Sequence, residues 1–190
     1  MDTLKEQDRW MMSFYRYSEI NGALFFGKIA AMLPPGPIQT DLNKHFADES
    51  MHSWYWTKAM EALDYKPIKI RNAYQDAYLE AGGLPVNMME ILALTNVFEK
   101  RVLKQYFHHM KLPGIHPVIK DTIELIAEDE KWHIQWINKA LDDMREKYGA
   151  DKVNRKIQHY KNADEEIYRN FVIENQQRLD YVMHKSASRI

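Results

Sequence analysis

The side chains best suited to chemistry lie in two short motifs of the form Asp-Glu-x-x-His, at residues 48–52 and 129–133. On a helix, residues three positions apart point in the same direction, so the Glu and His of each motif would lie side by side. A carboxylate beside an imidazole is half of a binding site for a first-row transition metal. Random placement of 14 Glu and 8 His among 190 residues gives about 0.6 Glu-x-x-His pairs. The repetition, with Asp before Glu both times, therefore indicates a site built from both motifs.

The elements that must position these motifs are long helices. Gly and Pro, seven of each, cluster and divide the chain into helical segments. The predicted segments are residues 3–33, 40–63, 85–110, 117–148 and 151–184, with a short helix at 74–79 and a break near Asn162 in the last. Short loops join the first long helix to the second and the third to the fourth, whereas about twenty residues join the second to the third. This pattern predicts an all-α fold, a four-helix bundle with one long crossover between helices 2 and 3 and a C-terminal helical segment.

Length and composition favour one domain spanning residues 1–190, with the bundle in 1–149 and a helical extension in 150–190. The net charge of -1 gives no sign of a nucleic-acid partner. The absence of cysteine excludes disulfides, thiolate zinc sites and iron–sulfur clusters. The N-terminus has no secretory pattern, and the most apolar run, residues 22–33, is too short to span a bilayer. We therefore expect a cytoplasmic protein with no membrane partner.

Two further carboxylates, Glu99 and Glu19, are candidate partners of the motifs, with a close match in depth along the bundle for Glu99 and a looser one for Glu19. Glu130 lies 13 residues after Pro117, and Glu99 lies 11 residues before Met110 on the neighbouring antiparallel helix. Glu19 stands in an apolar stripe of the first helix, where an unpaired carboxylate would be costly to bury. The predicted ligands are Glu19, Glu49, His52, Glu99, Glu130 and His133.

These ligands define the chemistry of the predicted site. Four carboxylates and two imidazoles suit two divalent cations bridged by carboxylates, because the cations neutralise a cluster that would otherwise repel itself. Oxygen and imidazole donors favour iron, with manganese as the alternative. We expect two iron ions as cofactors.

The chain resembles the ferritin-like di-iron carboxylate superfamily, which includes rubrerythrins, bacterioferritins and bacterial di-iron monooxygenases. The resemblance covers roughly residues 5–148 and rests on the two Asp-Glu-x-x-His motifs together with Glu19 and Glu99. It implies that Asp48 and Asp129 accept hydrogen bonds from ligand histidines on facing helices, which would orient the imidazoles. The chain lacks the rubrerythrin cysteines and carries Asn96 one turn before Glu99, so it matches no single subgroup.

Other residues near the ligands suggest supporting roles. Tyr15, one turn before Glu19, is the best candidate for a radical or for a residue that supports a ligand, although core packing is the commoner role of such a tyrosine. His45, one turn before Glu49, is either an extra ligand or a plain polar neighbour. Small residues one turn from the ligands indicate either close helix contact or a substrate pocket; they are Gly22, Ala23, Thr95 and Ala127.

The resulting functional hypothesis is a non-haem di-iron oxidoreductase that activates O2 to oxidise a small organic substrate. The alternatives are a ferroxidase, a rubrerythrin-like peroxide reductase and a ferritin-like iron-storage protein. The expected partners are O2 or peroxide, a small-molecule substrate and an electron donor. The charged segment 151–184 either covers one face of the bundle or mediates a homodimer.

Overall fold

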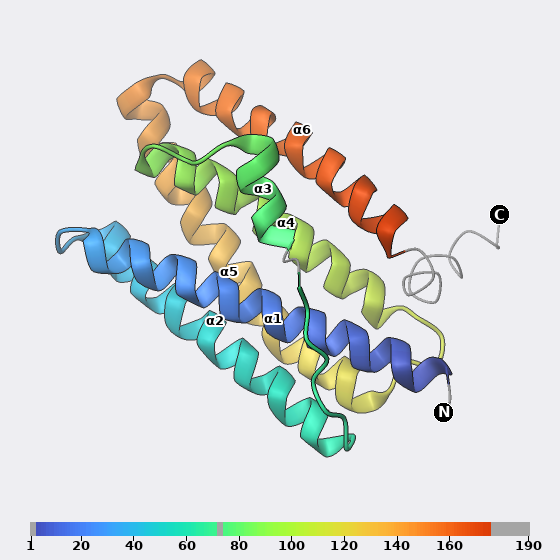
Figure 1. Cartoon of the computed structure of the whole chain (residues 1–190). Helices are drawn as coiled ribbons and strands as arrows, with labels where there is room; N and C mark the ends of the chain where they lie inside the picture. Colours follow the sequence, from blue (N-terminus) through green and yellow to red (C-terminus); the bar gives the residue numbers. More distant parts are fainter. Residues whose placement is uncertain (1–2, 72–73, 176–190) are drawn as a thin grey trace. The chain divides into compact units, whose positions relative to one another are not determined.

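The computed structural model describes residues 3–71 and 74–175, which form six helices and no strand (Figure 1). The all-α prediction is confirmed for this part of the chain. The helices are α1 (Thr3–Met32), α2 (Pro37–Ala62), α3 (Tyr74–Gly82), α4 (Met88–Met110), α5 (Pro117–Tyr148) and α6 (Ala150–Glu174). No helix in these two ranges is long and apolar enough to cross a lipid bilayer.

The helix ends follow local sequence chemistry. Helix α5 has the predicted bounds, and α2 begins at Pro37, three residues before the predicted Thr40, because proline is preorganised for the first helical turn. Helix α4 begins after Asn87, whose side-chain oxygen accepts a hydrogen bond from the Glu90 amide at 3.0 Å and so caps the helix. The break predicted near Asn162 is wrong, since α6 continues through it. Of the predicted last helix, residues 176–184 lie outside the described residues.

The described residues divide into two compact units. Unit 1 contains residues 3–71, 108–126 and 175, and unit 2 contains residues 74–107 and 127–174. Helices α4 and α5 therefore contribute to both units. The single domain expected from the chain length stays a prediction.

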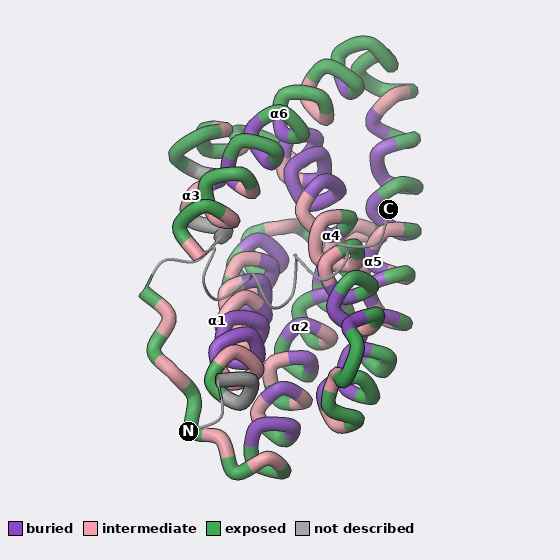
Figure 2. Tube along the Cα trace, turned by 90° about the vertical axis from the view of Figure 1, so that its right-hand side faces the viewer, coloured by how far each residue is buried: buried purple, intermediate pink, exposed green. Residues whose placement is uncertain are grey.

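Unit 1 is built on the hairpin of α1 and α2, which run side by side (Figure 1). Buried residues form a continuous stripe along α1 (Figure 2). This stripe includes Met12, Tyr15 and Phe26, and the facing side of α2 buries Leu42 and Trp56. The apolar spacing of three and four residues is what makes these segments helical and directs one face of each into the core.

Unit 2 is held together by polar contacts around Asp164 of α6. This buried carboxylate accepts hydrogen bonds from Tyr78 of α3 and from the Arg101 guanidinium of α4. Helix α3 also packs closely on α6 at Gly82, where a Cβ atom would lie 3.1 Å from the ring of Tyr160. The contacts of Asp164 thus join three helices of this unit.

Candidate metal centre

In unit 1, two adjacent helices direct four metal-ligand side chains into the interior. Glu49 and His52 of α2 lie on one helical face, His45 lies one turn earlier on the same face, and α1 supplies Glu19. Glu19 and Glu49 are each 4% exposed, and both histidines are fully buried. Burial of carboxylates at this depth is costly unless positive charge lies close to them.

The distances within unit 1 place the histidines next to the carboxylates. His45 Nε2 lies 3.3 Å from Glu49 Oε1. His52 Nδ1 lies 3.6 Å from Glu19 Oε2 and 4.0 Å from Glu49 Oε1. The ring of Phe26 stacks on His45 with a centroid distance of 3.9 Å, which fixes the orientation of that imidazole. The four side chains therefore offer oxygen and nitrogen donors at short mutual distances.

Gly22 gives the Glu49 carboxylate its place against α1. A Cβ atom at this glycine would lie 2.3 Å from Glu49 Oε2 and 3.2 Å from Glu49 Cδ. The side chain missing at position 22 thus leaves room for the carboxylate. The space beside Gly22 is filled by a predicted ligand.

The other small residues predicted to border a pocket are also buried. Ala23, Thr95 and Ala127 are 7%, 4% and 3% exposed, respectively. The Thr95 hydroxyl donates a hydrogen bond to the Ile91 carbonyl oxygen at 2.8 Å, as helical threonines often do. The substrate pocket beside these residues stays a prediction.

In unit 2, α4 and α5 carry the remaining predicted ligands. His133 Nδ1 lies 3.2 Å from Glu130 Oε2, so the second motif forms the side-by-side pair expected from its spacing. Glu99, Glu130 and His133 are 2%, 1% and 0% exposed. Each of the three is as deeply buried as its counterparts in unit 1.

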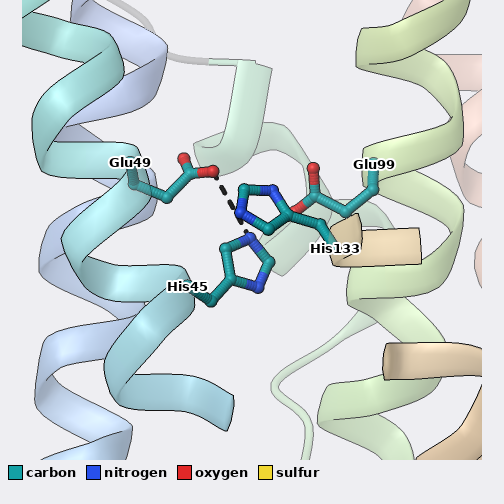
Figure 3. Close-up of side chains that lie close together, drawn as sticks. All are labelled: His45, Glu49, Glu99 and His133. Carbon is teal, nitrogen blue, oxygen red and sulfur yellow. Dashed lines mark ion pairs between the residues drawn. The ribbon is translucent and has the colours of Figure 1, made fainter. Parts of the chain in front are cut away.

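The residues that the structure describes include two groups of buried histidine and glutamate side chains that could hold metal ions. One group is His45, Glu49, Glu99 and His133, drawn in Figure 3 with the His45–Glu49 ion pair dashed. The other is Glu19, Glu49, His52 and Glu130. Together the groups contain all six predicted ligands and add His45. Glu49 belongs to both.

The two motif aspartates are less buried than the glutamates that follow them. Asp48 and Asp129 are both only partly buried. Asp48 accepts a hydrogen bond from Lys44, one turn earlier on α2. Their predicted hydrogen bonds to ligand histidines on facing helices stay a prediction.

Tyr15 forms a buried polar pair with a histidine. Its hydroxyl lies 3.2 Å from Nδ1 of His109, and its ring packs on Trp56 with a centroid distance of 5.0 Å. Burial lowers the pKa of His109 to about 4. The imidazole is therefore neutral at physiological pH, and in the tautomer with its proton on Nε2 its Nδ1 accepts a hydrogen bond from the Tyr15 hydroxyl.

Two of these buried histidines, His45 and His109, are not predicted as functional residues by the sequence. The sequence leaves His45 open as either an extra ligand or a polar neighbour, and it predicts no role for His109. His45 lies four residues before Glu49 and so shares its helical face. That spacing is the signal that could have identified His45. His109 lies ten residues after Glu99, which places it on a different face of α4, so helical spacing does not identify it.

Comparison of the chain with protein-family models, curated proteins and solved structures finds no match.

Proposed function

We propose that the chain is a non-haem di-iron oxidoreductase that activates O2 to oxidise a small organic substrate. The observation that supports the proposal is the pair of buried histidine–glutamate groups that could hold metal ions. Their donors are carboxylate oxygens and imidazole nitrogens, without any cysteine sulfur. Such donors suit iron or manganese in the divalent state.

In this proposal the helices form a ferritin-like bundle, and its buried glutamates and histidines hold two metal ions. Glu49 belongs to both groups, so it would contribute to holding both cations. His45 joins the six ligands predicted from the sequence and makes the centre richer in nitrogen. An extra imidazole is neutral, so it stabilises a cation without adding to the negative charge of the four glutamates.

The chain's own residues would have several tasks. The glutamates would balance the charge of two cations, and the histidines would hold neutral nitrogens toward them. The buried apolar surroundings would exclude bulk water, which strengthens every electrostatic interaction inside the site. Bound iron would supply the electrons for reduction of O2. Tyr15, which shares a hydrogen bond with the neutral His109, would keep its hydroxyl in a fixed orientation inside the protein.

Oxidation of Fe(II) itself is a second candidate, supported by the packing at Gly22. The space beside that glycine is taken by the Glu49 carboxylate, so it is not part of a substrate cavity. Ferroxidase chemistry needs no organic substrate pocket. This observation weakens the case that small residues on α1 line such a pocket.

The test of the proposed function is oxygen chemistry after metal loading. The full chain would be loaded anaerobically with Fe(II) and then mixed with O2, while O2 consumption and Fe(III) absorbance are recorded. We expect rapid O2 consumption by the loaded protein and little by Glu130→Ala or His133→Ala. A wild-type protein that binds no iron, or binds iron and does not react with O2, would contradict the proposal.

Variants that fill the predicted pocket distinguish oxidation of an organic substrate from oxidation of Fe(II). For an organic substrate, Ala23→Leu and Ala127→Leu should block substrate oxidation and leave oxidation of bound Fe(II) intact. Loss of both reactions in variants that still bind iron would favour the ferroxidase. Unfolding of both variants would identify these positions as tight helix contacts and would remove the sequence support for an organic substrate.

A further inference from the structure

A second site is suggested by the connection that follows α2. Residues 63–71 lie against α1 within unit 1 (Figure 1). Two hydrogen bonds fasten this segment to the helix: Arg9 Nε donates to the Lys66 carbonyl oxygen at 2.7 Å, and the Ile68 amide donates to Ser13 Oγ at 2.9 Å. The segment is therefore held in a defined position on one face of α1.

A cavity of about 610 Å³ lies between the segment and the helix. Ser13, Arg16 and Tyr17 line it from α1, and residues 67–71 line it from the segment. The volume falls within the range of small-molecule sites. None of the eight lining residues is one of the proposed metal ligands.

All charged side chains that line the cavity are positive. Its lining includes Arg16, Lys69 and Arg71, and none of the eight lining residues carries a carboxylate. Across the described ranges 3–71 and 74–175, these three cations form no ion pair with an acidic side chain. This concentration of positive charge contrasts with the net charge of -1 for the whole chain. Such a cavity attracts anions.

Neighbouring side chains hold Arg16 in a position where it can bind an anion. Its Nε donates a hydrogen bond to Thr57 Oγ1 at 2.7 Å, and the Thr57 hydroxyl donates to the Ser53 carbonyl oxygen at 2.9 Å. The guanidinium is only partly exposed, and its two terminal nitrogens carry four more N–H groups. A guanidinium held in this way loses little freedom when it binds an oxyanion through two parallel hydrogen bonds.

The remaining walls are largely apolar. Pro67, Ile68 and Ile70 come from the segment, and the ring of Tyr17 comes from α1. An inorganic ion would leave these surfaces in contact with water, whereas an organic group attached to the anion would cover them. We propose that this cavity binds a small organic anion, with its carboxylate or phosphate on Arg16 and its apolar part against Tyr17 and the isoleucines.

The experiment is calorimetric titration of the full chain at low ionic strength with benzoate, phenyl phosphate and inorganic phosphate. We expect one molecule of an aromatic anion to bind per chain, and inorganic phosphate to bind more weakly. Preference for benzoate would identify the oxyanion as a carboxylate, and preference for phenyl phosphate would identify it as a phosphate. Absence of binding by both aromatic anions, or equal binding of inorganic and phenyl phosphate, would overturn the proposal.

Two variants test whether the aromatic anion binds in this cavity. Arg16→Gln should weaken binding by about tenfold or more, since it removes a charge-assisted bidentate contact. Lys120→Gln, which removes one positive charge from an exposed pair with Glu124 on α5, is the matched control and should bind within twofold of wild type. Equal losses in both variants would show that only net charge matters and would overturn the proposal.

A second variant, Arg71→Gln, tests the proposal if Arg16→Gln does not fold. Arg71 is exposed and lies in the extended segment, so Arg71→Gln should fold normally and weaken binding several-fold. It should not change the metal content, which separates this site from anion binding at the proposed metal centre. Unchanged anion affinity in Arg71→Gln would overturn the proposal even if Arg16→Gln cannot be purified.

Discussion

Two regions of the molecule bury carboxylates among different neighbours. In unit 2, Asp164 contacts the permanently charged Arg101 and the hydroxyl of Tyr78. In unit 1, Glu19 and Glu49 form their ion pairs with histidines, which are positive only when protonated. An Asp–Arg–Tyr network is satisfied by the protein itself, whereas a Glu–His cluster is the arrangement that accepts a metal cation. The comparison predicts that Asp164 stabilises the fold, and it supports the proposal that the glutamates, which could hold metal ions, bind them.

The largest expected effect is the loss of stability in Asp164→Ala. Removing the carboxylate takes away the ion pair of the largely buried Arg101 side chain with Asp164 and the hydrogen-bond acceptor of Tyr78, so the free energy of unfolding should fall by about 3–5 kcal/mol. Urea denaturation measures this change. The control is Asp142→Ala, an exposed carboxylate paired with Arg145, which should cost less than about 1 kcal/mol.

Urea denaturation and metal binding of Glu49→Gln should show the opposite pattern to those of Asp164→Ala. This variant should lose metal binding, while the metal-free protein keeps its stability because one buried negative charge is removed. The folded fraction of Asp164→Ala should retain its metal affinity. If Glu49→Gln destabilises the metal-free protein as much as Asp164→Ala does, the two regions have the same structural role and the comparison fails.

The second largest effect concerns the pH dependence of stability. The pKa of His109 is about 4 in the folded protein and 6.5 in the unfolded chain, so the unfolded state binds more protons between these values. The stability contributed by neutral His109 is present above pH 6.5 and is lost as the pH falls toward 4. At pH 5 the loss should be about 2 kcal/mol.

His109→Gln tests this assignment, because glutamine does not titrate. Urea denaturation of the metal-free wild type and variant at pH 7 and pH 5 should show a smaller acid-induced loss in the variant, by about 2 kcal/mol. Tyr15→Phe, which keeps the histidine, should retain the acid sensitivity. An identical pH dependence in wild type and His109→Gln would show that this histidine is not buried in its neutral form.

The aspartates of the two motifs should have an intermediate effect on the metal centre. If Asp48 and Asp129 orient ligand histidines, replacement of either by alanine should lower metal affinity by about 10–100-fold and preserve helical content. Competition with a metal chelator, alongside circular dichroism, measures both quantities. Wild-type affinity in both variants would assign these partly buried residues to the protein surface.

The smallest expected effect is that of one methyl group at position 22. In Gly22→Ala the new Cβ would occupy the place of Glu49 Oε2, so the carboxylate must rotate away and metal affinity should fall by about tenfold. Helix stability should rise slightly, since alanine favours helices over glycine by about 1 kcal/mol.

Gly27→Ala is the matched control for this substitution. It is also on α1, but its new Cβ would meet the ring of Phe46 at 3.1 Å and no metal-ligand candidate. Metal affinity should therefore stay at the wild-type value. Equal affinities in the two glycine variants would show that Glu49 binds metal from a different position.

The sequence predicted the helical class and several helix ends well, because proline and glycine act locally. Pro117 starts α5 and Gly149 follows its last residue, Tyr148, as expected. The second helix begins at Pro37, three residues before the predicted Thr40, because a proline that follows a helix-breaking run can itself occupy the first helical turn. The continuity of α6 through Asn162 was missed because burial of Tyr160, Ala163 and Ile167 outweighs the weak helix preference of one asparagine.

The candidate ligands were predictable where chemistry and helical spacing coincide. Glu130 and His133 form the predicted pair, and Glu19 lies buried in its apolar stripe. His109 was not predicted, because its partner Tyr15 lies 94 positions away in the chain and no local pattern joins them. The role of Gly22 also depends on a contact across two helices, so helical spacing on α1 suggested a pocket where Glu49 lies.

The most direct test of the central claim is an anaerobic equilibrium titration of the metal-free chain with Fe(II), followed by elemental analysis after removal of unbound iron. The proposed centre predicts about two iron ions per chain in the wild type, and a large loss in Glu49→Gln and in His133→Ala. The metal-loaded wild type should also resist urea better than the metal-free chain, because metal binds only the folded state. A wild-type chain that retains no iron, or variants that retain as much iron as wild type, would contradict the assignment of these glutamates and histidines as metal ligands.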